Sequence, residues 1–232
     1  MDHTDAQKSL HQHASPAKAR TLRTFFKTGP GQYGEGDVFI GVKVPEVRAV
    51  AKLFKDLDLK SVVKLLHAPI HEERLLALLI LIHQYNSGTV RSKKNIVRLY
   101  LQHTDHINNW DLIDLTAPRI IGTWLKDKDR GILDRLADSR NMWERRIAIV
   151  ATHAFIREKQ FSDTFRIART LLHDKEDLIH KAVGWMLRET GKRDIRALKD
   201  FLKPRHSLMP RTMLRYAIER FPEQERQQYL QK

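Results

Sequence analysis

The chain has 232 residues and a formal net charge of +14, because 42 Lys and Arg residues outnumber 28 Asp and Glu residues. Such a charge favours polyanionic partners or anionic membrane surfaces, and nucleic acid is the main expectation. The absence of cysteine excludes disulfides, thiolate metal sites and cysteine nucleophiles. The first 20 residues lack the apolar core of a signal peptide, and the longest apolar run, Leu75–Ile82, is too short to span a bilayer. We therefore expect a soluble, cytoplasmic protein.

Residues 1–20 are expected to be flexible or partly helical. Residues 28–37 are rich in glycine, but they lack the Gly-Lys-Ser/Thr of a phosphate-binding P-loop and no βαβ unit surrounds them. We interpret them as an irregular loop whose glycines permit turns with positive φ. A short extended piece is expected at Val38–Val44.

Helical periodicity dominates from Pro45 onward, and it predicts an all-α chain with short connections between antiparallel neighbours. The predicted helices cover residues 45–57, 59–67, 71–85, 89–102, 110–126, 128–138, 141–157, 161–172, 175–190, 193–202, 207–221 and 223–231. No Pro-, Gly- or Ser-rich linker divides them, so residues 21–232 are expected to form a single domain.

Equivalent apolar stretches begin at Arg74, Trp110, Arg146 and Lys181, with spacings of 36, 36 and 35 residues. A period of this length with two helices in each repeat indicates a curved α-solenoid of HEAT or armadillo character, which offers an extended concave surface. A generic helical bundle is the alternative. The twelve histidines are scattered, without a pair at metal-ligand spacing that stands out, so no metal site is predicted.

Trp110 and Asp114 are four residues apart and share one face of a predicted helix, with Asp114 at the edge of its apolar arc. Pro118 removes a backbone donor and its ring clashes with the carbonyl of residue 114, so it should kink the helix at the carboxylate. These residues suit a site at the rim of a groove. The alternative is a solvated aspartate beside a core tryptophan.

Arg145 and Arg146 follow a segment that resembles a capping box, in which Asn141 caps the helix and Glu144 occupies its third position. Helix N-termini attract phosphate, and Asn109 and Asp174 precede neighbouring helices in a similar way. The alternative for Arg146 is a structural salt bridge.

Trp185 occupies a place near that of Asp114 in its own repeat, with Arg188 on the same helical face. Gly184 before it weakens the helix, which suggests close approach by another group. A core position is the alternative for this tryptophan.

These residue types suit cleavage of the N-glycosidic bond of a cationic alkylated purine. The reaction develops positive charge on the sugar, which a carboxylate can stabilise while it orients the attacking water. Tryptophan faces favour a cationic base, by ~0.5–2 kcal/mol each. Because alkylation has already made the base a good leaving group, no metal or redox cofactor is expected.

The chain resembles the HEAT-like-repeat alkylpurine DNA glycosylases, the AlkD-type DNA alkylation repair proteins, from about Phe25 to Phe221. Four segments carry the resemblance in the expected order: Gly34–Arg48, Asn108–Pro118 with its Trp-Asp-x-x-Asp pattern, Trp143–Ile149 and Gly184–Glu189. The chain departs from some members at Asn109, where they have a second tryptophan. The glycine-rich insertion leaves Phe26 and Tyr33 as alternative candidates for an N-terminal aromatic contact.

The resemblance implies that Asp114 is the catalytic carboxylate, that Trp110 and Trp185 contact the lesion, and that Arg146 binds the DNA backbone. We further assign Arg145, Arg188 and Lys43 to the backbone. The implied activity is hydrolysis of N3- or N7-alkylated purines from double-stranded DNA without metal or cofactor, by a nucleoid-associated monomer that needs no protein partner. An open surface rather than a deep pocket is expected to receive the lesion. The alternative is a non-catalytic HEAT-repeat protein that binds damaged or branched DNA.

Overall fold

The computed structural model describes residues 1–231, and within them it contains helices and a single isolated β-bridge between Val38 and Ile70. The predicted all-α fold of HEAT-like helical repeats is confirmed. Each of the four predicted repeat positions lies on a helix: Arg74 on α5 (His71–Ser87), Trp110 on α7 (Trp110–Ala117), Arg146 on α9 (Met142–Ala151) and Lys181 on α12 (Asp177–Arg193). Within the described residues, no helix is both long and apolar enough to cross a membrane.

Contacts divide the chain into two compact units, Met1–Leu112 and a second that begins at Ile113, so that the boundary falls within α7. The single domain expected for residues 21–232 stays a prediction. The other helices of the first unit are α1 (His3–His11), α2 (Pro16–Phe25), α3 (Val44–Leu53), α4 (Leu59–Leu66), α6 (Val90–Gln102) and the 3₁₀ turn η1 (Thr104–His106). Residues 1–20 are thus helical over much of their length.

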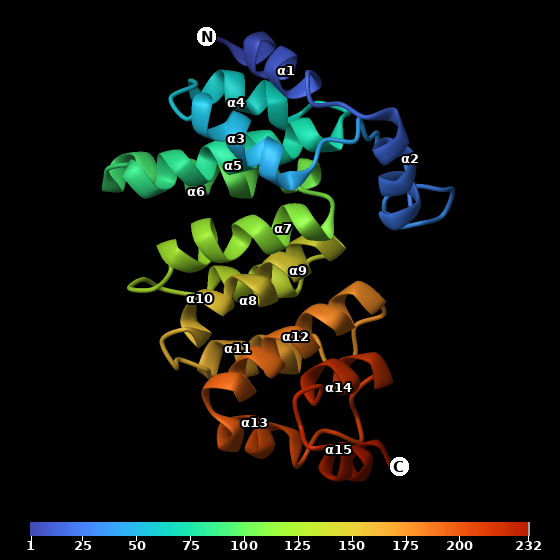
Figure 1. The fold of residues 1–232 in the computed structure, drawn as a ribbon. Coiled ribbons are helices and arrows are strands. Elements are labelled where there is room, and N and C mark those ends of the chain that lie inside the picture. Colours follow the sequence, from blue (N-terminus) through green and yellow to red (C-terminus); the bar gives the residue numbers. More distant parts are fainter. Residues whose placement is uncertain (232) are drawn as a thin grey trace. The chain divides into compact units, whose positions relative to one another are not determined.

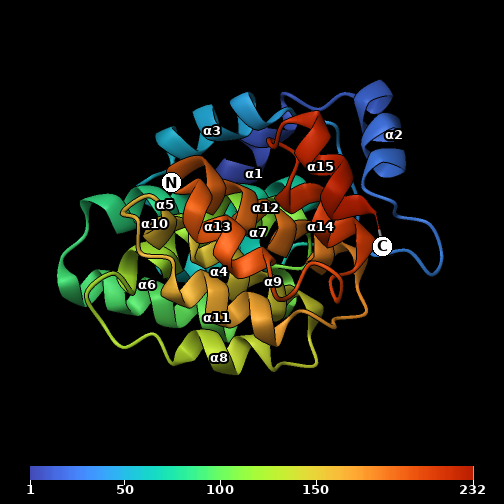
Figure 2. The same ribbon diagram turned by 90° about the horizontal axis from the view of Figure 1, so that it is seen from below.

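The second unit contains the π-helical turn η2 (Pro118–Gly122), α8 (Ile132–Ala137), α10 (His153–Ile156), α11 (Ser162–Thr170), α13 (Ile195–Leu202), α14 (Arg211–Ala217) and α15 (Glu223–Leu230). In Figures 1 and 2, α8 lies beside α11, and α9 lies beside α12. The predicted helix over 110–126 changes at Pro118 from α7 to η2. Proline cannot donate to the hydrogen-bond ladder of the helix, and the π turn begins at this residue.

Helix α5 organises the first unit, where it packs against α3, α4 and α6 (Figure 1). Every residue from His71 to Ile82 is buried, which is typical of a helix that is covered on all sides. Its first turn nevertheless consists of the polar residues His71, Glu72, Glu73 and Arg74. All four are buried, at most 4 % exposed. Buried polar groups of this kind require partners, and these come from the N-terminal segment and from the start of α7.

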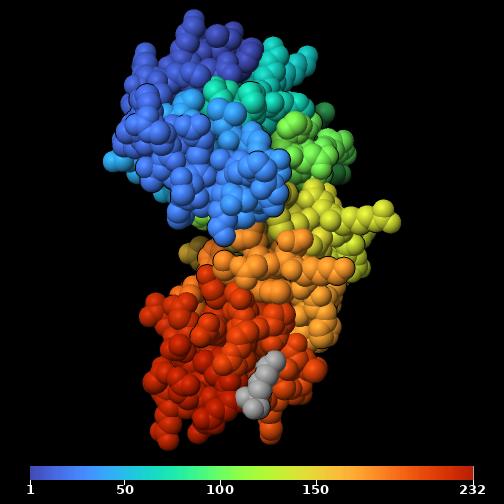
Figure 3. Space-filling model, turned by 90° about the vertical axis from the view of Figure 1, so that its right-hand side faces the viewer, coloured from blue at the N-terminus to red at the C-terminus, as the bar shows by residue number. Residues whose placement is uncertain are grey.

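The two glutamates of this turn anchor the N-terminal segment, whose α1, α2 and glycine-rich loop lie at the surface of the unit (blue in Figure 3). Glu72 accepts hydrogen bonds from the backbone N–H groups of Ile40, Gly41 and Val42, at 3.1, 2.8 and 3.2 Å. Glu73 pairs with His11 and Gln7 of α1, at 2.6 and 2.7 Å. Gly41 has a φ of +84°, and a Cβ there would meet the Ser15 carbonyl at 2.2 Å, so this position requires glycine.

His71 lies between two carboxylates. Its Nδ1 is 3.1 Å from Asp37 Oδ2 and its Nε2 is 2.9 Å from Asp111 Oδ2, while Arg74 donates to Asp37 Oδ1 at 2.6 Å. Burial alone would lower the pKa of His71, but the charge of Asp111 and the hydrogen bonds to both aspartates raise it to about 9. Burial likewise opposes ionisation of Asp37, but His71 and Arg74 hold the pKa of that carboxyl below its usual value. The imidazole is therefore protonated at neutral pH.

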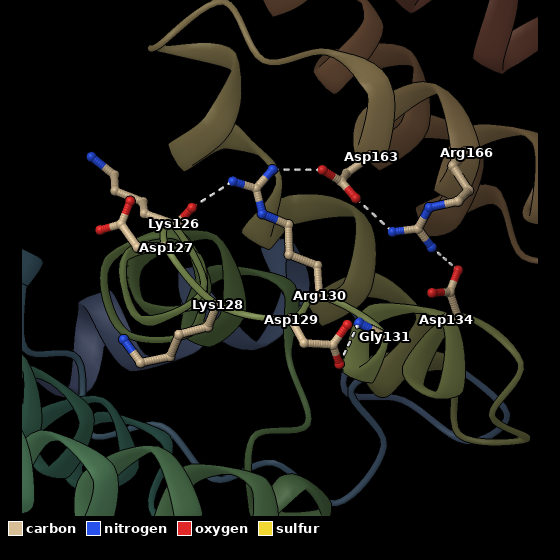
Figure 4. A pocket seen from close by; sticks show the side chains of 9 residues that line it. All are labelled: Lys126, Asp127, Lys128, Asp129, Arg130, Gly131, Asp134, Asp163 and Arg166. Carbon is tan, nitrogen blue, oxygen red and sulfur yellow. Dashed lines mark hydrogen bonds and ion pairs between the residues drawn. The ribbon is translucent and has the colours of Figure 1, made fainter.

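In the second unit, a series of ion pairs connects the loop that precedes α8 to α11 (Figure 4). Arg130 donates to Asp163 at 2.6 Å, Asp163 accepts from Arg166 at 2.6 Å, and Arg166 also pairs with Asp134. Arg130 lies 3.8 Å above the ring centroid of Phe155 and also bonds the carbonyls of Leu125 and Lys126. Because Arg130 is already paired with Asp163, we interpret this cluster of ion pairs as structural.

We predict that stability decreases as the pH rises from about 6.5 towards about 9. The folded-state pKa of His71 lies above the 6.5 of an unperturbed histidine, so its contribution to stability is complete below pH 6.5 and is lost as the pH rises through about 9. Urea unfolding between pH 6 and 9 should show a loss on the order of a few kcal/mol. The His71→Gln variant should be less stable than the wild type at pH 6, and its free energy of unfolding should change much less with pH. His13→Gln, at an exposed histidine, should retain the wild-type profile; equal profiles for all three proteins would contradict the prediction.

Candidate active site

Asp114 and Arg146 form a bidentate ion pair in the second unit. Arg146 Nε donates to Asp114 Oδ1 at 2.9 Å, and Nη2 donates to Oδ2 at 2.8 Å. The remaining nitrogen, Nη1, donates to the carbonyl of Leu178 on α12 at 2.6 Å. Two parallel N–H···O bonds fix both the position and the plane of the carboxylate, which a lysine in this place would not do.

The pair is asymmetric in its access to solvent. The Arg146 side chain is 6 % exposed, whereas the Asp114 side chain is 17 % exposed. The arginine is therefore enclosed and the carboxylate keeps part of its surface accessible, as a group that acts on an external molecule requires. The predicted place of Asp114 at the edge of the apolar arc agrees with this, since Leu112 and Ile113 beside it are fully buried.

Local sequence sets the position of Arg146. Asn141 caps α9, as predicted, and its side chain accepts a hydrogen bond from the N–H of Trp143 at 2.9 Å. The guanidinium of Arg146 then reaches back to α7 and across to α12. The sequence assigned Arg146 to the DNA backbone and left a salt bridge as the alternative; the salt bridge is present, and a phosphate contact by Arg146 stays a prediction.

Trp110 belongs to an aromatic cluster in the first unit, together with Phe25, Phe26 and Tyr33. Its ring stacks on Phe26, with centroids 5.2 Å apart, and meets the edge of Phe25 at 5.9 Å. Its Nε1 donates to the hydroxyl of Tyr33 at 3.3 Å. Both candidates for an N-terminal aromatic contact, Phe26 and Tyr33, therefore touch Trp110.

The glycine-rich loop brings Tyr33 to this cluster. Gly31 and Gly36 have φ values of +72° and +84°, and a Cβ on Gly34 would meet the Phe26 carbonyl at 2.4 Å. The glycines thus permit the loop to fold back against the end of α2. Phe25 is 61 % exposed and was not singled out from the sequence. The signal was present in the Phe25-Phe26 pair directly before the glycines, but only folding shows which ring faces outward.

Trp185 lies on α12 in the second unit and is partly exposed. Its Nε1 donates to Glu189 at 3.2 Å, and its ring centroid lies 6.1 Å from that of His153. A Cβ on Gly184 would meet the Met213 carbonyl and Tyr216 Cβ, both at 2.5 Å. The group whose close approach Gly184 implied is therefore α14, not an external ligand.

The remaining predicted backbone contacts differ in their surroundings. Arg145 uses Nε and Nη2 on Asp174, at 2.6 and 3.3 Å, and Nη1 on the carbonyls of Ser139 and Arg140. Arg188 pairs with Glu219. Arg145 would have to exchange bonds within the protein to contact a phosphate, whereas the buried Nε of Arg188 has no hydrogen-bond partner among the described residues. Lys43 is exposed at the N-cap of α3.

Asp111 and His71 were not recognised from the sequence as a pair, because 40 residues separate them. Within residues 1–231, no group of three or more His, Cys, Asp or Glu side chains is arranged to hold a metal ion. Neither His71 nor Asp111 is therefore a candidate metal ligand. We interpret the hydrogen bond between them as part of the scaffold around Trp110.

We predict that Arg146→Gln lowers the free energy of unfolding by about 2–4 kcal/mol, because it leaves Asp114 without its enclosed partner. Lys181→Gln, which breaks an exposed pair with Asp177, should cost under about 0.5 kcal/mol. Urea unfolding of Arg146→Gln, Asp114→Leu and the double variant should give an interaction free energy between the two side chains of about 1–3 kcal/mol. A loss no larger than that of Lys181→Gln would refute this view of the pair.

Comparison with known proteins gives a family and a fold. The family model described as DNA alkylation repair enzyme matches residues 6–221. Among solved structures, the chain is similar to a predicted DNA alkylation repair enzyme from Enterococcus faecalis, with a TM-score of 0.69 and 16 % identity over 91 % of this chain and 98 % of that one. No curated protein matches the sequence. At this identity the solved structure shows a shared fold, and the match to the family model over nearly the whole chain shows that the protein belongs to the DNA alkylation repair enzyme family.

Proposed function

We propose that the protein is an alkylpurine DNA glycosylase that uses Asp114 as its catalytic carboxylate. The observation that carries this proposal is the bidentate pair in which the enclosed Arg146 orients a partly exposed Asp114. A carboxylate held in this way is preorganised, so it need not rearrange as charge develops on a substrate. Membership of a DNA alkylation repair family supplies the class of substrate.

The proposed substrate is a purine alkylated at N3 or N7 in double-stranded DNA, which carries a positive charge on the base. As the C1′–N bond breaks, its electron pair goes to the base and neutralises it, and positive charge appears on the sugar. Asp114 stabilises that charge and orients water, whose oxygen bonds to C1′ while its proton leaves to Asp114 or solvent. The base is already a good leaving group, so the proposed reaction uses no cofactor.

Trp110 and Trp185 are the proposed contacts to the lesion, and both rings are partly exposed. An indole face attracts a cationic base or an electron-poor sugar. The net charge of +14 favours the DNA backbone, and Lys43 is the proposed phosphate contact whose side chain is most plainly exposed. Arg145 and Arg146 remain proposed contacts that would first exchange partners within the protein, and Arg188, which pairs with Glu219, remains a third proposed contact.

We expect Asp114→Asn to slow release of 7-methylguanine from alkylated duplex DNA by ~10²–10³-fold, because it removes the charge that stabilises the transition state. Binding to unmodified duplex should stay within a few-fold of the wild-type value. Asp138→Asn, at an exposed aspartate of the same unit, is the matched control and should release base as the wild type does. Circular dichroism would verify that both variants are folded.

The rival function is non-catalytic binding of damaged or branched DNA through the same proposed backbone contacts. It predicts that neither the wild type nor Asp114→Asn releases base, although both bind DNA. Equal release by the two proteins would instead remove Asp114 from the catalytic role and leave the reaction to another residue.

For DNA affinity, we expect log Kd to depend steeply on log salt concentration, with a slope of about 0.9 for each phosphate neutralised. Lys43→Ala should reduce that slope by about one contact and weaken binding to all sequences alike. Lys94→Ala, at an exposed lysine of α6, serves as a charge-matched control. If the two variants lose affinity and slope equally, Lys43 is not a specific backbone contact.

A further inference from the structure

The first unit contains a pocket of about 450 Å³ whose lining includes neither the proposed catalytic residue Asp114 nor the proposed lesion contacts Trp110 and Trp185. It lies between α2, the segment 39–42, the start of α3 and the start of α5. Its wall is mostly apolar and includes Leu22, Phe26, Phe39, Val42 and Leu75. A pocket of this size with an apolar wall and a few polar groups is typical of a small-molecule site, for which ~300–1,000 Å³ is common.

The acidic side chains of the lining offer hydrogen-bond acceptors. Asp111 is a lining residue whose Oδ2 receives His71, while its buried Oδ1 has no hydrogen-bond partner among residues 1–231. A buried carboxylate oxygen without a donor is uncommon in a folded protein. Glu72 also lines the pocket, and its oxygens accept hydrogen bonds from three backbone N–H groups. The protein's own donors here are thus committed, and a ligand that carries an N–H group would supply the missing one.

The rim of the pocket is cationic. Lys18 on α2 and Lys43 at the N-cap of α3 both line it, and both side chains are exposed. Two lysines close to an apolar pocket favour a ligand with a phosphate or carboxylate group outside the apolar part. Together, these lining residues favour a molecule that combines an N–H donor, an apolar body and an anionic group.

We propose that this pocket binds a nucleotide, with the base between the apolar side chains, a base N–H group directed to Asp111 Oδ1, and the phosphate at Lys18 and Lys43. A fatty acid would satisfy the wall and the rim but would leave Asp111 Oδ1 without a donor. The nucleotide has two possible sources, a free monophosphate or a nucleotide turned out of DNA. The inference goes beyond the proposed glycosylase reaction, because binding requires no base excision and no part of it involves Asp114.

The chain offers a matched pair of variants on α2. Thr21 and Thr24 are exposed threonines whose hydroxyls both donate to the carbonyl four residues earlier, at 3.4 Å. Thr21 lines the pocket. Thr21→Trp should fill the pocket, whereas Thr24→Trp makes the same chemical change beside it. Neither variant alters the charge, so the general attraction of a basic protein for anions stays constant.

The test is titration of the full-length protein with 2′-deoxyguanosine 5′-monophosphate, followed by calorimetry. We expect saturable binding whose Kd rises at least ~10-fold in Thr21→Trp and stays within about twofold in Thr24→Trp. Lys18→Ala should weaken the monophosphate about two- to fivefold and leave 2′-deoxyguanosine, which has no phosphate, unchanged. Asp114→Asn should bind like the wild type, so loss of glycosylase activity and loss of this site are distinguishable. Thermal unfolding would verify the fold of each variant.

A duplex that contains 2-aminopurine distinguishes the two sources. An increase in its fluorescence on binding to the wild type and to Thr24→Trp, but not to Thr21→Trp, would identify a nucleotide turned out of DNA. Saturable binding of the monophosphate without that increase would identify the free nucleotide. If Thr21→Trp and Thr24→Trp bind the monophosphate equally, and if neither differs in the fluorescence assay, the proposal is overturned.

Discussion

The enclosed guanidinium of Arg146 is the interaction on which the candidate site depends. It joins three helices of the second unit, because it binds Asp114 of α7 with two nitrogens and the Leu178 carbonyl of α12 with the third, while it is itself part of α9. A planar group with donors in fixed directions can satisfy these acceptors together. The position of Asp114 is therefore determined by the packing of helices from separate repeats, not by α7 alone.

In the first unit, a larger cluster of buried polar side chains holds separate segments of the chain together. Four consecutive polar residues at the start of α5 are buried, and their partners lie in the preceding chain and in α7, with Asp37 shared by His71 and Arg74. Removing one partner from such a network leaves a buried charge unpaired, which costs more than the net value of the bond. The cluster thereby fixes where α1, the 38–42 segment and Asp111 lie, and two of its members, His71 and Glu72, line the pocket.

Both units use glycine where two backbones approach closely. Gly41 allows the 38–44 segment to lie against α2, and Gly184 allows α12 to lie against α14. A residue with a proposed role follows each glycine in the chain. Lys43, two residues after Gly41, lines the pocket, and Trp185, directly after Gly184, is a proposed lesion contact. Close packing at the glycine keeps these side chains in place without burying them, which suits residues that must meet a ligand.

The sequence by itself determined the helical class, the 36-residue repeat and the residues worth testing, because periodicity and helix caps are local properties of the chain. It also located the break at Pro118, which follows from the missing N–H. It left Arg146 between a phosphate contact and a salt bridge, and it did not pair His71 with Asp111 or Phe25 with Trp110. Tertiary structure alone decided those pairings, since partners 32 and 40 residues apart meet only when the packing of several helices brings their side chains within hydrogen-bond distance.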